Sequence, residues 1–403
     1  MSEFVSDVTI VGGGIAGLWT AKELLDRGYG VNLVEKSGSL AAGATTRNEG
    51  WLHAGTYHAV AIDNEADASQ VTARTIYGHD EIVRFAPESI DHQTSYAFIR
   101  DDELAQRALY RWGRLGVEFR EMPYRHFSAE GFDTDRISAA FAVKDKSVNS
   151  VVLCKKLTEY IFEHGGRIFL DASYHPVDDG VAEMSIGDDR HILRSEATIV
   201  SAGAGTKDIF QEVTGKPFPM RYFKSHLLVA PRLSNDNFFY VDPMEAGIMS
   251  HGNGTIIGIN REASEETDAM CGVDSRKVAL LRHALGEMLP STRQLDASHF
   301  SPVACVKADV VESSAYQAGP VVQDLNIKVL EPAPNYICAI PGKMTEAPAL
   351  GRAAADFIET GRGVTVERRS APNVSFIGES AFPITSRPLD IWLSERPEQE
   401  EAS

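Results

Sequence analysis

Residues 8–17 read VTIVGGGIAG, and this stretch decides the fold. The β-branched run at residues 8–11 is typical of a strand that is buried on both faces of a parallel sheet. Apolar residues at helical spacing over 18–27 predict a helix, and a second β-branched run at 31–34 ends at Glu35. Strand, glycine turn, helix, strand and acid in this order predict the first βαβ unit of a dinucleotide-binding domain.

The glycines of this unit each have a mechanical role. Gly12 would make the tight turn, Gly14 would let the backbone approach a pyrophosphate, and Gly17 would let the helix pack closely on the strand. The helix N-terminus would present free N–H groups to the phosphates, and Glu35 would accept hydrogen bonds from a ribose diol. We therefore expect the nucleotide to be bound by Gly12, Gly14, Ile15, Ala16, Gly17, Glu35 and Lys36.

The composition restricts the classes of function. The chain has 403 residues, 57 acidic against 39 basic side chains, and a formal net charge of −18. This charge argues against a nucleic-acid-binding protein, which needs a basic surface to displace counterions from phosphates. It also disfavours docking on an anionic membrane surface. Because an acidic surface repels small anions, a site for a carboxylate substrate would need a local positive field.

The ends and the cysteines of the chain predict where the protein works. The N-terminus has no basic n-region, and no run of 18 apolar residues is present, so we expect neither a signal peptide nor a transmembrane segment. Cys154, Cys271, Cys305 and Cys338 form no CxxC pair and no metal-ligand spacing. We expect reduced thiols in a cytoplasmic protein and no metal site.

Residues 45–58, which read TTRNEGWLHAGTYH, carry the most specific resemblance to a known family. The segment resembles the T-S-x-x-N-S-G-V-I-H-A-G-I-Y-Y motif of the L-2-hydroxyglutarate oxidases and dehydrogenases. These enzymes are a branch of the D-amino-acid oxidase superfamily of FAD-dependent oxidoreductases, which also includes glycerol-3-phosphate dehydrogenases and sarcosine oxidases. Glu49 and Trp51 are bulkier than the family's serine and valine, which indicates a flavin-facing surface shaped for another substrate. The matching residues are Thr45, Asn48, Gly50, His53, Ala54, Gly55 and Tyr57.

Three further segments resemble the same superfamily. Residues 145–170 look like its return into the FAD domain, with the backbone near Val177 expected at the adenine. Residues 197–205 resemble the turn at which the sheet approaches the FAD again. Residues 341–345, which read PGKMT, are similar to its GGK-[LW]-T flavin-binding turn and are predicted to open a helix that runs to about 358. The N-terminus of that helix would stabilise negative charge on a reduced flavin.

The resemblance implies FAD as the cofactor and an α/β fold. This fold has a Rossmann-type (GR2-like) FAD-binding domain and a mostly antiparallel-sheet substrate domain. Strand-like alternation over residues 225–259 favours the second of these domains. We expect the FAD-binding domain at 1–80, 145–215 and 325–370, the substrate domain at 81–144 and 216–324, and a C-terminal extension and tail at 371–403. The further FAD contacts that the resemblance implies are Thr45, Thr46, Arg47, Asn48, Gly50, Trp51, Leu52, Val177, Ala202, Gly203, Cys305, Gly342, Lys343, Met344 and Thr345.

Residues 371–392 extend beyond the family pattern. They include Phe376, Phe382, Ile391 and Trp392, which favours either an extension that packs on the rest of the chain or an oligomer contact.

Two residues are candidates for catalysis. The resemblance puts the loop of His53 beside the flavin, and an imidazole can serve as the base because it titrates near the operating pH. The alternative is a histidine that only hydrogen-bonds the cofactor.

Lys307 stands where the family has an arginine in a G-x-R-[PA] stretch, so it is the candidate partner of a substrate carboxylate, as a point charge rather than a two-pronged donor. Other candidate anion partners are Arg47, Arg221 and Lys224.

Cys305 leaves two alternatives open. It falls where this stretch resembles monomeric sarcosine oxidases, in which a cysteine is joined to the 8-methyl carbon of the flavin. The other alternative is a buried thiol beside the ring.

These patterns predict a flavoenzyme that oxidises the α C–H of a small 2-hydroxy acid by hydride transfer to flavin N5, with oxygen or another electron acceptor. An amine or amino-acid oxidase of the sarcosine or D-amino-acid oxidase type is the main alternative. A non-catalytic flavin-binding subunit is a third interpretation, against which His53 and the intact glycine turn argue.

Overall fold

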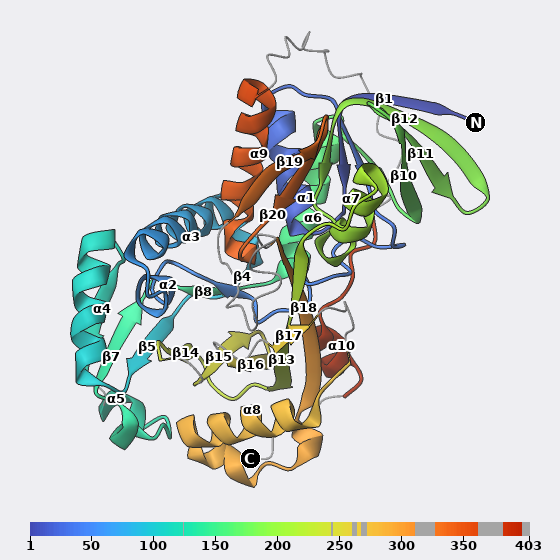
Figure 1. The fold of residues 1–403 in the computed structure, drawn as a ribbon. Helices are drawn as coiled ribbons and strands as arrows, with labels where there is room; N and C mark the ends of the chain where they lie inside the picture. Colours follow the sequence, from blue (N-terminus) through green and yellow to red (C-terminus); the bar gives the residue numbers. More distant parts are fainter. Residues whose placement is uncertain are drawn as a thin grey trace.

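The computed structural model describes residues 1–123, 125–242, 245–259, 264–266, 272–310, 327–361 and 382–396. Two large β-sheets organise this part of the chain, one in each half of the molecule (Figure 1). The glycine turn belongs to the first sheet, which lies in the upper half of Figure 1, and the second sheet lies in the lower half.

The first sheet has a parallel centre. Its order is β10-β11-β12-β1-β2-β9. Strand β12 pairs with β1 along one edge, and along the other edge with β11 in its first half and with β20 near its end. The strands are β1 (Glu3–Val11), β2 (Val31–Val34), β9 (Arg167–Phe169), β10 (Ala172–Asp178), β11 (Val181–Ile186), β12 (Asp189–Val200), β19 (Lys328–Ala333) and β20 (Tyr336–Ile340).

Helices cover both faces of this sheet because its central strands are apolar on both sides. Val8 and Ile10 face a core formed with α1 (Ile15–Asp26), α6 (Ser150–Glu163) and α9 (Ala347–Gly361). The alternate residues, such as Val11, face the opposite core, to which Phe210 of α7 (Thr206–Thr214) belongs. The predicted two-sided burial of β1 therefore follows the period of two in a strand.

The second sheet is mostly antiparallel. Its order is β17-β13-β16-β15-β14-β5-β7-β6, and β18 pairs with β13 along ten residues of register. The pair of β14 with β5 is parallel. The strands are β5 (Ser95–Ile99), β6 (Phe119–Met122), β7 (Ala139–Val143), β13 (Met220–Pro231), β14 (Asn237–Tyr240), β15 (Ala246–His251), β16 (Gly254–Ile259), β17 (Ser264–Glu266) and β18 (Ser301–Val310).

Other elements connect the two halves. A small sheet of β3 (Trp51–Leu52), β8 (Lys146–Val148) and β4 (Ile90–His92) lies between them. Asn64 and Asp101 accept hydrogen bonds from free N–H groups at the starts of α3 and α4, which explains where these helices begin. The remaining helices are α2 (His58–Ala61), α3 (Glu65–Phe85), α4 (Asp102–Leu115), α5 (Arg125–Ser128), α8 (Ser275–Met288) and α10 (Pro388–Ser394).

The predicted α/β fold with a Rossmann-type sheet and a mostly antiparallel second sheet is confirmed. We propose that the two sheets are the cores of two domains, because the first draws its strands from 3–34, 167–200 and 328–340, and the second from 95–143 and 220–310. Among the helices that the structure describes, none is both long enough and apolar enough to cross a membrane.

The helix predicted to open at 341–345 starts later, because a 3₁₀ turn at Met344–Glu346 comes before α9 at Ala347. Cys271 and Phe376 lie outside the described residues.

Candidate active site

Two glycines at the turn after β1, Gly12 and Gly17, have no room for a side chain. Gly12 has φ of +113°, and a Cβ there would lie 2.6 Å from the carbonyl oxygen of Ser201. A Cβ on Gly17 would lie 2.0 Å from the carbonyl oxygen of Gly12. These contacts give Gly12 and Gly17 the roles of tight turn and close helix packing that the sequence predicts.

The groups expected at the nucleotide gather around this turn. The carboxylate of Glu35 accepts hydrogen bonds from the N–H groups of Gly13 (2.7 Å) and Ser37 (2.8 Å). The hydroxyl of Thr45 accepts from the N–H of Ile15 (3.0 Å), at the first residue of α1. The first turn of α1 carries no acidic side chain, so this helix places no carboxylate of its own at its positive end.

The end of β12 reaches the same turn. The N–H of Ser201 donates to the carbonyl of Val11 (2.9 Å), which places Ala202 and Gly203 directly beside the end of β1. Gly203 has φ of +54° and begins a short 3₁₀ helix at Gly203–Gly205. The structure therefore brings two predicted segments, 12–17 and 201–203, into contact.

Residues 45–53, which belong to the 45–58 segment expected at the flavin, dock on the turn at 342–345. The side-chain amide of Asn48 donates to the carbonyl of Thr45 (2.7 Å) and contacts the sulfur of Met344 (3.6 Å). Its oxygen accepts from the N–H of Gly50 (2.7 Å). The N–H of His53 donates to the hydroxyl of Thr345 (3.2 Å). Asn48 therefore stabilises its own loop and connects this loop to Met344.

Helix α3 packs directly against this turn, a contact that the sequence did not predict. A Cβ on Gly78 would lie only 1.8 Å from the carbonyl oxygen of Thr345, so the helix backbone rests directly on the turn. Arg74, one turn earlier, forms an ion pair with the buried carboxylate of Glu346 (2.7 Å). The signal was a glycine inside a helical pattern, which often marks close packing.

Aromatic rings surround His53. The Trp51 ring lies 4.3 Å from that of His53 and 4.2 Å from that of Phe239 in β14. The indole N–H of Trp51 donates to Asp145 (2.9 Å), which fixes the ring. The ring of His58 lies 4.5 Å from that of His53. His53 is therefore held in place by its neighbours and is almost fully buried.

A family model for FAD dependent oxidoreductases (DAO) matches residues 7–357. The chain belongs to this family. The predicted cofactor, FAD, and the predicted class, an oxidoreductase, are thereby confirmed. The narrower resemblance to the L-2-hydroxyglutarate enzymes stays a prediction.

Curated relatives of this FAD-dependent oxidoreductase are distant in sequence. A Pseudomonas aeruginosa protein described as a probable FAD-dependent oxidoreductase is 23% identical over 320 residues, which is 71% of this chain and 75% of the relative. The anaerobic glycerol-3-phosphate dehydrogenase subunit A1 of Haloferax volcanii is 28% identical over 166 residues, which is 40% of this chain and 27% of that subunit.

Solved structures share the fold. Glycine oxidase from Geobacillus kaustophilus has a TM-score of 0.67 at 16% identity, covering 94% of this chain and 98% of that one. The L-alpha-glycerophosphate oxidase from Mycoplasma pneumoniae, solved with FAD bound, has a TM-score of 0.69 at 17% identity, covering 88% and 95%. At these identities the likeness concerns the fold alone.

Three charged groups of the oxidoreductase interact electrostatically near the turn at 342–345. Lys307 lies on β18, and Lys343 is part of the turn at 342–345 that precedes α9. Glu49 lies against Gly258 of β16, since a Cβ on Gly258 would be 3.0 Å from the Glu49 carboxylate. Burial raises the pKa of Glu49, but Lys307 and then Lys343 outweigh it and lower that pKa below its usual value. No ion pair within 4.0 Å joins Glu49 to either lysine, so their opposite charges interact at longer range.

Burial and neighbouring charges shift the pKa values of the two lysines and of His53. Burial, and then the charge of Lys307, lowers the pKa of Lys343 to about 8. Burial opposes the charge on Lys307, but Glu49 and then Cys305 together outweigh it and raise the pKa of that lysine. The pKa of His53 lies well below its usual value, first because it is buried and then because of His58 and the two lysines. The site therefore combines a neutral imidazole with a local positive field.

Some residues expected in the site lie elsewhere or have another environment. The N–H of Ala172, at the start of β10, donates to the carbonyl of Glu35. Val177 comes five residues later on the same strand, and it is 64% exposed. Cys305 is fully buried in an apolar cluster with Leu389 and Trp392 of α10. The covalent link to the flavin through Cys305 stays a prediction.

The three other candidate anion partners are not alike. Arg221 and Lys224 are buried on β13, and Arg221 is opposite Asp309 in the register with β18. Arg47 is partly buried in the 45–58 segment.

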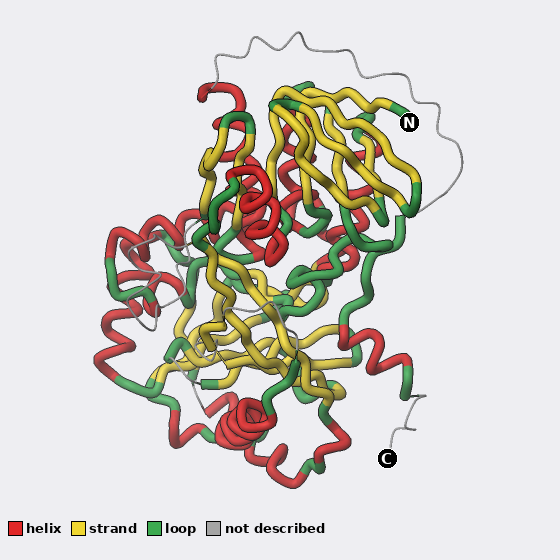
Figure 2. The backbone as a smooth tube through the Cα atoms, turned by 45° about the vertical axis from the view of Figure 1, so that its right-hand side comes forward, coloured by secondary structure: helices red, strands yellow, loops and turns green. Residues whose placement is uncertain are grey.

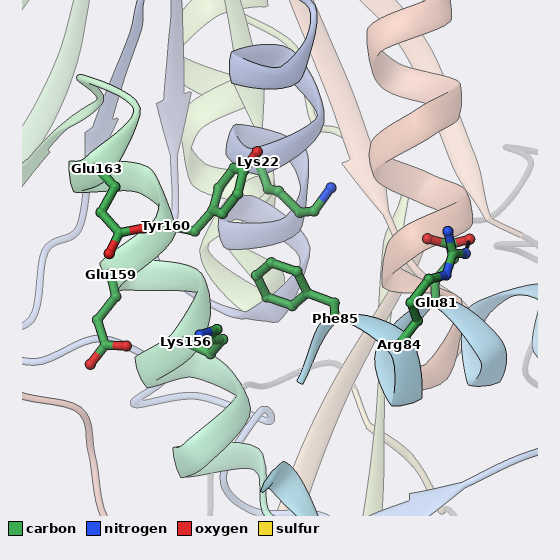
Figure 3. Close-up of a pocket in the computed structure, with 8 residues that line it drawn as sticks. All are labelled: Lys22, Glu81, Arg84, Phe85, Lys156, Glu159, Tyr160 and Glu163. Carbon is green, nitrogen blue, oxygen red and sulfur yellow. Dashed lines mark ion pairs between the residues drawn. The ribbon is translucent and has the colours of Figure 1, made fainter. Parts of the chain in front are cut away.

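A separate groove of about 420 Å³ lies on the outer surface among α1, α3 and α6 (Figure 3). Lys22 lies over the rings of Phe85 and Tyr160 at its wall, at 5.6 and 5.5 Å from their centroids. The groove is lined by none of the predicted site residues, so it is distinct from the nucleotide and flavin region.

Proposed function

We propose that this FAD-dependent oxidoreductase oxidises the α C–H of a small 2-hydroxy acid by hydride transfer to flavin N5. The observation that carries the proposal is a neutral, buried His53 next to two lysine ammonium groups. FAD, when bound, supplies the hydride acceptor. The residues of the chain then have two tasks, which are to take the hydroxyl proton and to hold the carboxylate.

His53 is the proposed base. A secondary alcohol loses its O–H proton as its α C–H hydride leaves, so a positioned proton acceptor lowers the barrier. The lowered pKa of His53 keeps its imidazole neutral at neutral pH, and its Nδ1 makes no hydrogen bond to any described residue. The backbone bond to Thr345 and the ring contacts with Trp51 and His58 fix where this imidazole lies.

Lys307 is the proposed partner of the carboxylate. Its pKa is raised, so it carries a full charge at neutral pH, whereas Lys343 loses its proton near pH 8. Together they create the local positive field that a chain of net charge −18 needs in order to admit an anion. A lysine presents a point charge, so it tolerates more than one orientation of the carboxylate.

Glu49 supports a second candidate, the oxidation of an amine or an amino acid. Glu49 and Lys307 influence each other electrostatically but form no ion pair, so both charges remain for a substrate with an ammonium and a carboxylate group. The fold likeness to glycine oxidase is compatible with this candidate but does not favour it, because the glycerophosphate oxidase has the same fold. A non-catalytic flavin-binding subunit gains no support from the buried base and its charged neighbours.

Anaerobic reduction of the bound FAD distinguishes these candidates. The yellow protein is mixed without oxygen with a panel of 2-hydroxy acids, α-amino acids, N-methylated amines and sn-glycerol 3-phosphate, and the loss of flavin absorbance is followed. Bleaching by a 2-hydroxy acid, and none by its amino analogue, supports the proposal. Bleaching by amino acids alone overturns it in favour of the second candidate, and no bleaching by any compound favours the non-catalytic interpretation.

Two further properties follow from simple measurements. Oxygen consumption during turnover, compared with reduction of an artificial acceptor dye, decides whether oxygen is the electron acceptor. Acid precipitation of the holoenzyme decides the state of Cys305, because a covalently linked flavin stays with the protein and a free one is released.

A further inference from the structure

The C-terminal arm, defined as residues 382–394, lies beyond the part of the chain that the family model matches. It crosses from the half of the molecule that holds the first sheet to the half that holds the second, and it ends in α10 (Figure 2). Along this path it contacts the segments that flank the FAD site at both ends.

The first contact is beside the glycine turn. The N–H of Leu40 donates to the carbonyl of Pro383 (2.9 Å), and the N–H of Thr385 donates to the carbonyl of Leu40 (2.9 Å). The hydroxyls of Ser39 and Thr385 are also hydrogen-bonded (2.6 Å). The side chain of Leu40 lies 2.5 Å from where a Cβ on Gly13 would be. The arm therefore fixes the residue that packs on the phosphate-binding turn.

The second contact runs through three charged or polar side chains to the flavin loop. Arg387 donates to Asp91 (2.7 Å), and Asp91 is hydrogen-bonded to Nδ1 of His251 (2.8 Å). Nε2 of His251 donates to the carbonyl of Glu49 (2.8 Å), because a carbonyl can only accept. A Cβ on Gly50 would lie 2.5 Å from the His251 ring. The chain of contacts ends on the peptide that joins Glu49 to Gly50.

The arm is held firmly at both contacts. Arg387 is only 5% exposed, and its guanidinium forms two further bonds of 2.8 Å with Asp390 of α10. A buried cation is stable only when it is fully paired, so this arrangement depends on both carboxylates. In α10, Leu389 and Trp392 pack on an apolar cluster with Cys305 of β18.

We propose that the C-terminal arm is part of the FAD site and that Arg387 is a positioning residue within it. Through Leu40 the arm sets the phosphate end, and through Asp91 and His251 it sets the Glu49–Gly50 peptide at the flavin end. Docking of the arm and binding of FAD then stabilise each other, since each requires the same arrangement of residues 39–50. This inference depends on FAD as the cofactor and on no particular substrate.

The test measures the affinity of the full-length apoprotein for FAD, by quenching of flavin fluorescence on titration. Arg387→Ala is expected to raise the Kd for FAD by about 10-fold or more, the size expected when charge-assisted hydrogen bonds are lost. Arg387→Lys keeps the charge but not the two-pronged geometry, so its Kd for FAD is expected to lie between those of the wild type and Arg387→Ala. Arg396→Ala is the matched control, because Arg396 follows the same arm, contacts the Trp392 ring and makes no contact with Asp91 or Leu40.

A second readout separates positioning from a loss of folding. FAD is expected to slow chymotryptic cleavage after Trp392, in α10 of the arm, in the wild-type protein. This protection is expected to be lost in Thr385→Val, which breaks the hydroxyl pair with Ser39. If Arg387→Ala yields no folded protein, Thr385→Val decides the question by its Kd alone. An unchanged Kd in a folded Arg387→Ala variant, or in Thr385→Val where the first cannot be made, overturns the proposal.

Discussion

The imidazole ring of His58 lies 4.5 Å from that of His53, at an angle of 66° between their planes, so the two rings meet edge to face. Neither nitrogen of His58 forms a hydrogen bond with any residue that the structure describes. Burial, and then Lys343 and Arg74, holds the pKa of His58 well below its usual value. Two neutral imidazoles therefore share one buried space, and a proton on either disfavours a proton on the other.

This pair predicts the pH dependence of flavin reduction. The pKa of His53 lies well below 6.5, so His53 stays unprotonated around neutral pH and does not limit the reduction rate there. The rate is expected to fall only in more acidic solution, where His53 takes up a proton. His58→Phe keeps the ring burial but removes one cause of the shift, so the acidic limb should move to higher pH. Lys343 and Lys307 also face His53 and would continue to lower its pKa.

The measurement is anaerobic stopped-flow reduction of the holoenzyme between pH 4.5 and 8. An acidic limb that stays in place in a folded, FAD-bound His58→Phe variant would contradict the coupling of the two rings.

His53→Ala should leave the protein yellow but inactive. The side chain is proposed to take the substrate proton, and a positioned base typically contributes about 10²–10⁴ to the rate. The flavin reduction rate is therefore expected to fall by about this factor while the FAD content stays near that of the wild type. Near-normal reduction at saturating substrate would leave His53 only a structural role at the site.

Glu49 and Lys307 should act in opposite directions on a hydroxy acid. Lys307→Met removes the charge that pairs with the carboxylate and is expected to raise the Kd of a 2-hydroxy acid about 10-fold or more. Glu49→Gln removes a repelling carboxylate, so at a pH at which Lys307 stays protonated it should lower that Kd. An α-amino acid behaves differently, because its ammonium group would lose a partner in Glu49→Gln.

Lys155→Met is the matched control for these variants, because Lys155 is exposed on α6 and its side chain is 64% accessible. Binding is measured by the spectral change of the oxidised flavin on titration. Weaker binding of a hydroxy acid to Glu49→Gln would count against the proposed roles of both charges.

Local patterns made much of the fold predictable. The run at 8–17 followed by Glu35 gave the first βαβ unit, because each step of that unit depends on neighbours in sequence. The alternation over 225–259 gave strands of the second sheet for the same reason. The parallel pairing of β14 with β5 could not be predicted, since these strands lie about 140 residues apart and nothing in either sequence specifies the other.

The candidate site was predictable only in its parts. Asn48 and His53 stood out through the family motif, but their bonds to the 342–345 turn are made across almost 300 residues of sequence. Arg387 had no local signal, because a buried arginine is specified by the distant carboxylate of Asp91 as much as by Asp390. Charge pairing across a fold depends on tertiary geometry, which residue spacing does not encode.

Gly78→Ala tests whether close packing of α3 supports the flavin turn. The added methyl would lie 1.8 Å from the carbonyl oxygen of Thr345, and backbone cannot yield as a flexible side chain does. Overpacking of this kind typically costs about 1–3 kcal/mol in the free energy of unfolding. Because the turn at 342–345 must move, FAD affinity should also fall.

Gly113→Ala is the matched control, since Gly113 lies in α4 with open space around its Cβ position. There the same substitution should stabilise the protein by about 0.5–1 kcal/mol, because alanine is the better helix former. Urea unfolding of the apoprotein measures the first effect, and titration with FAD measures the second. If Gly78→Ala matched Gly113→Ala in both measurements, α3 would not determine the position of the turn.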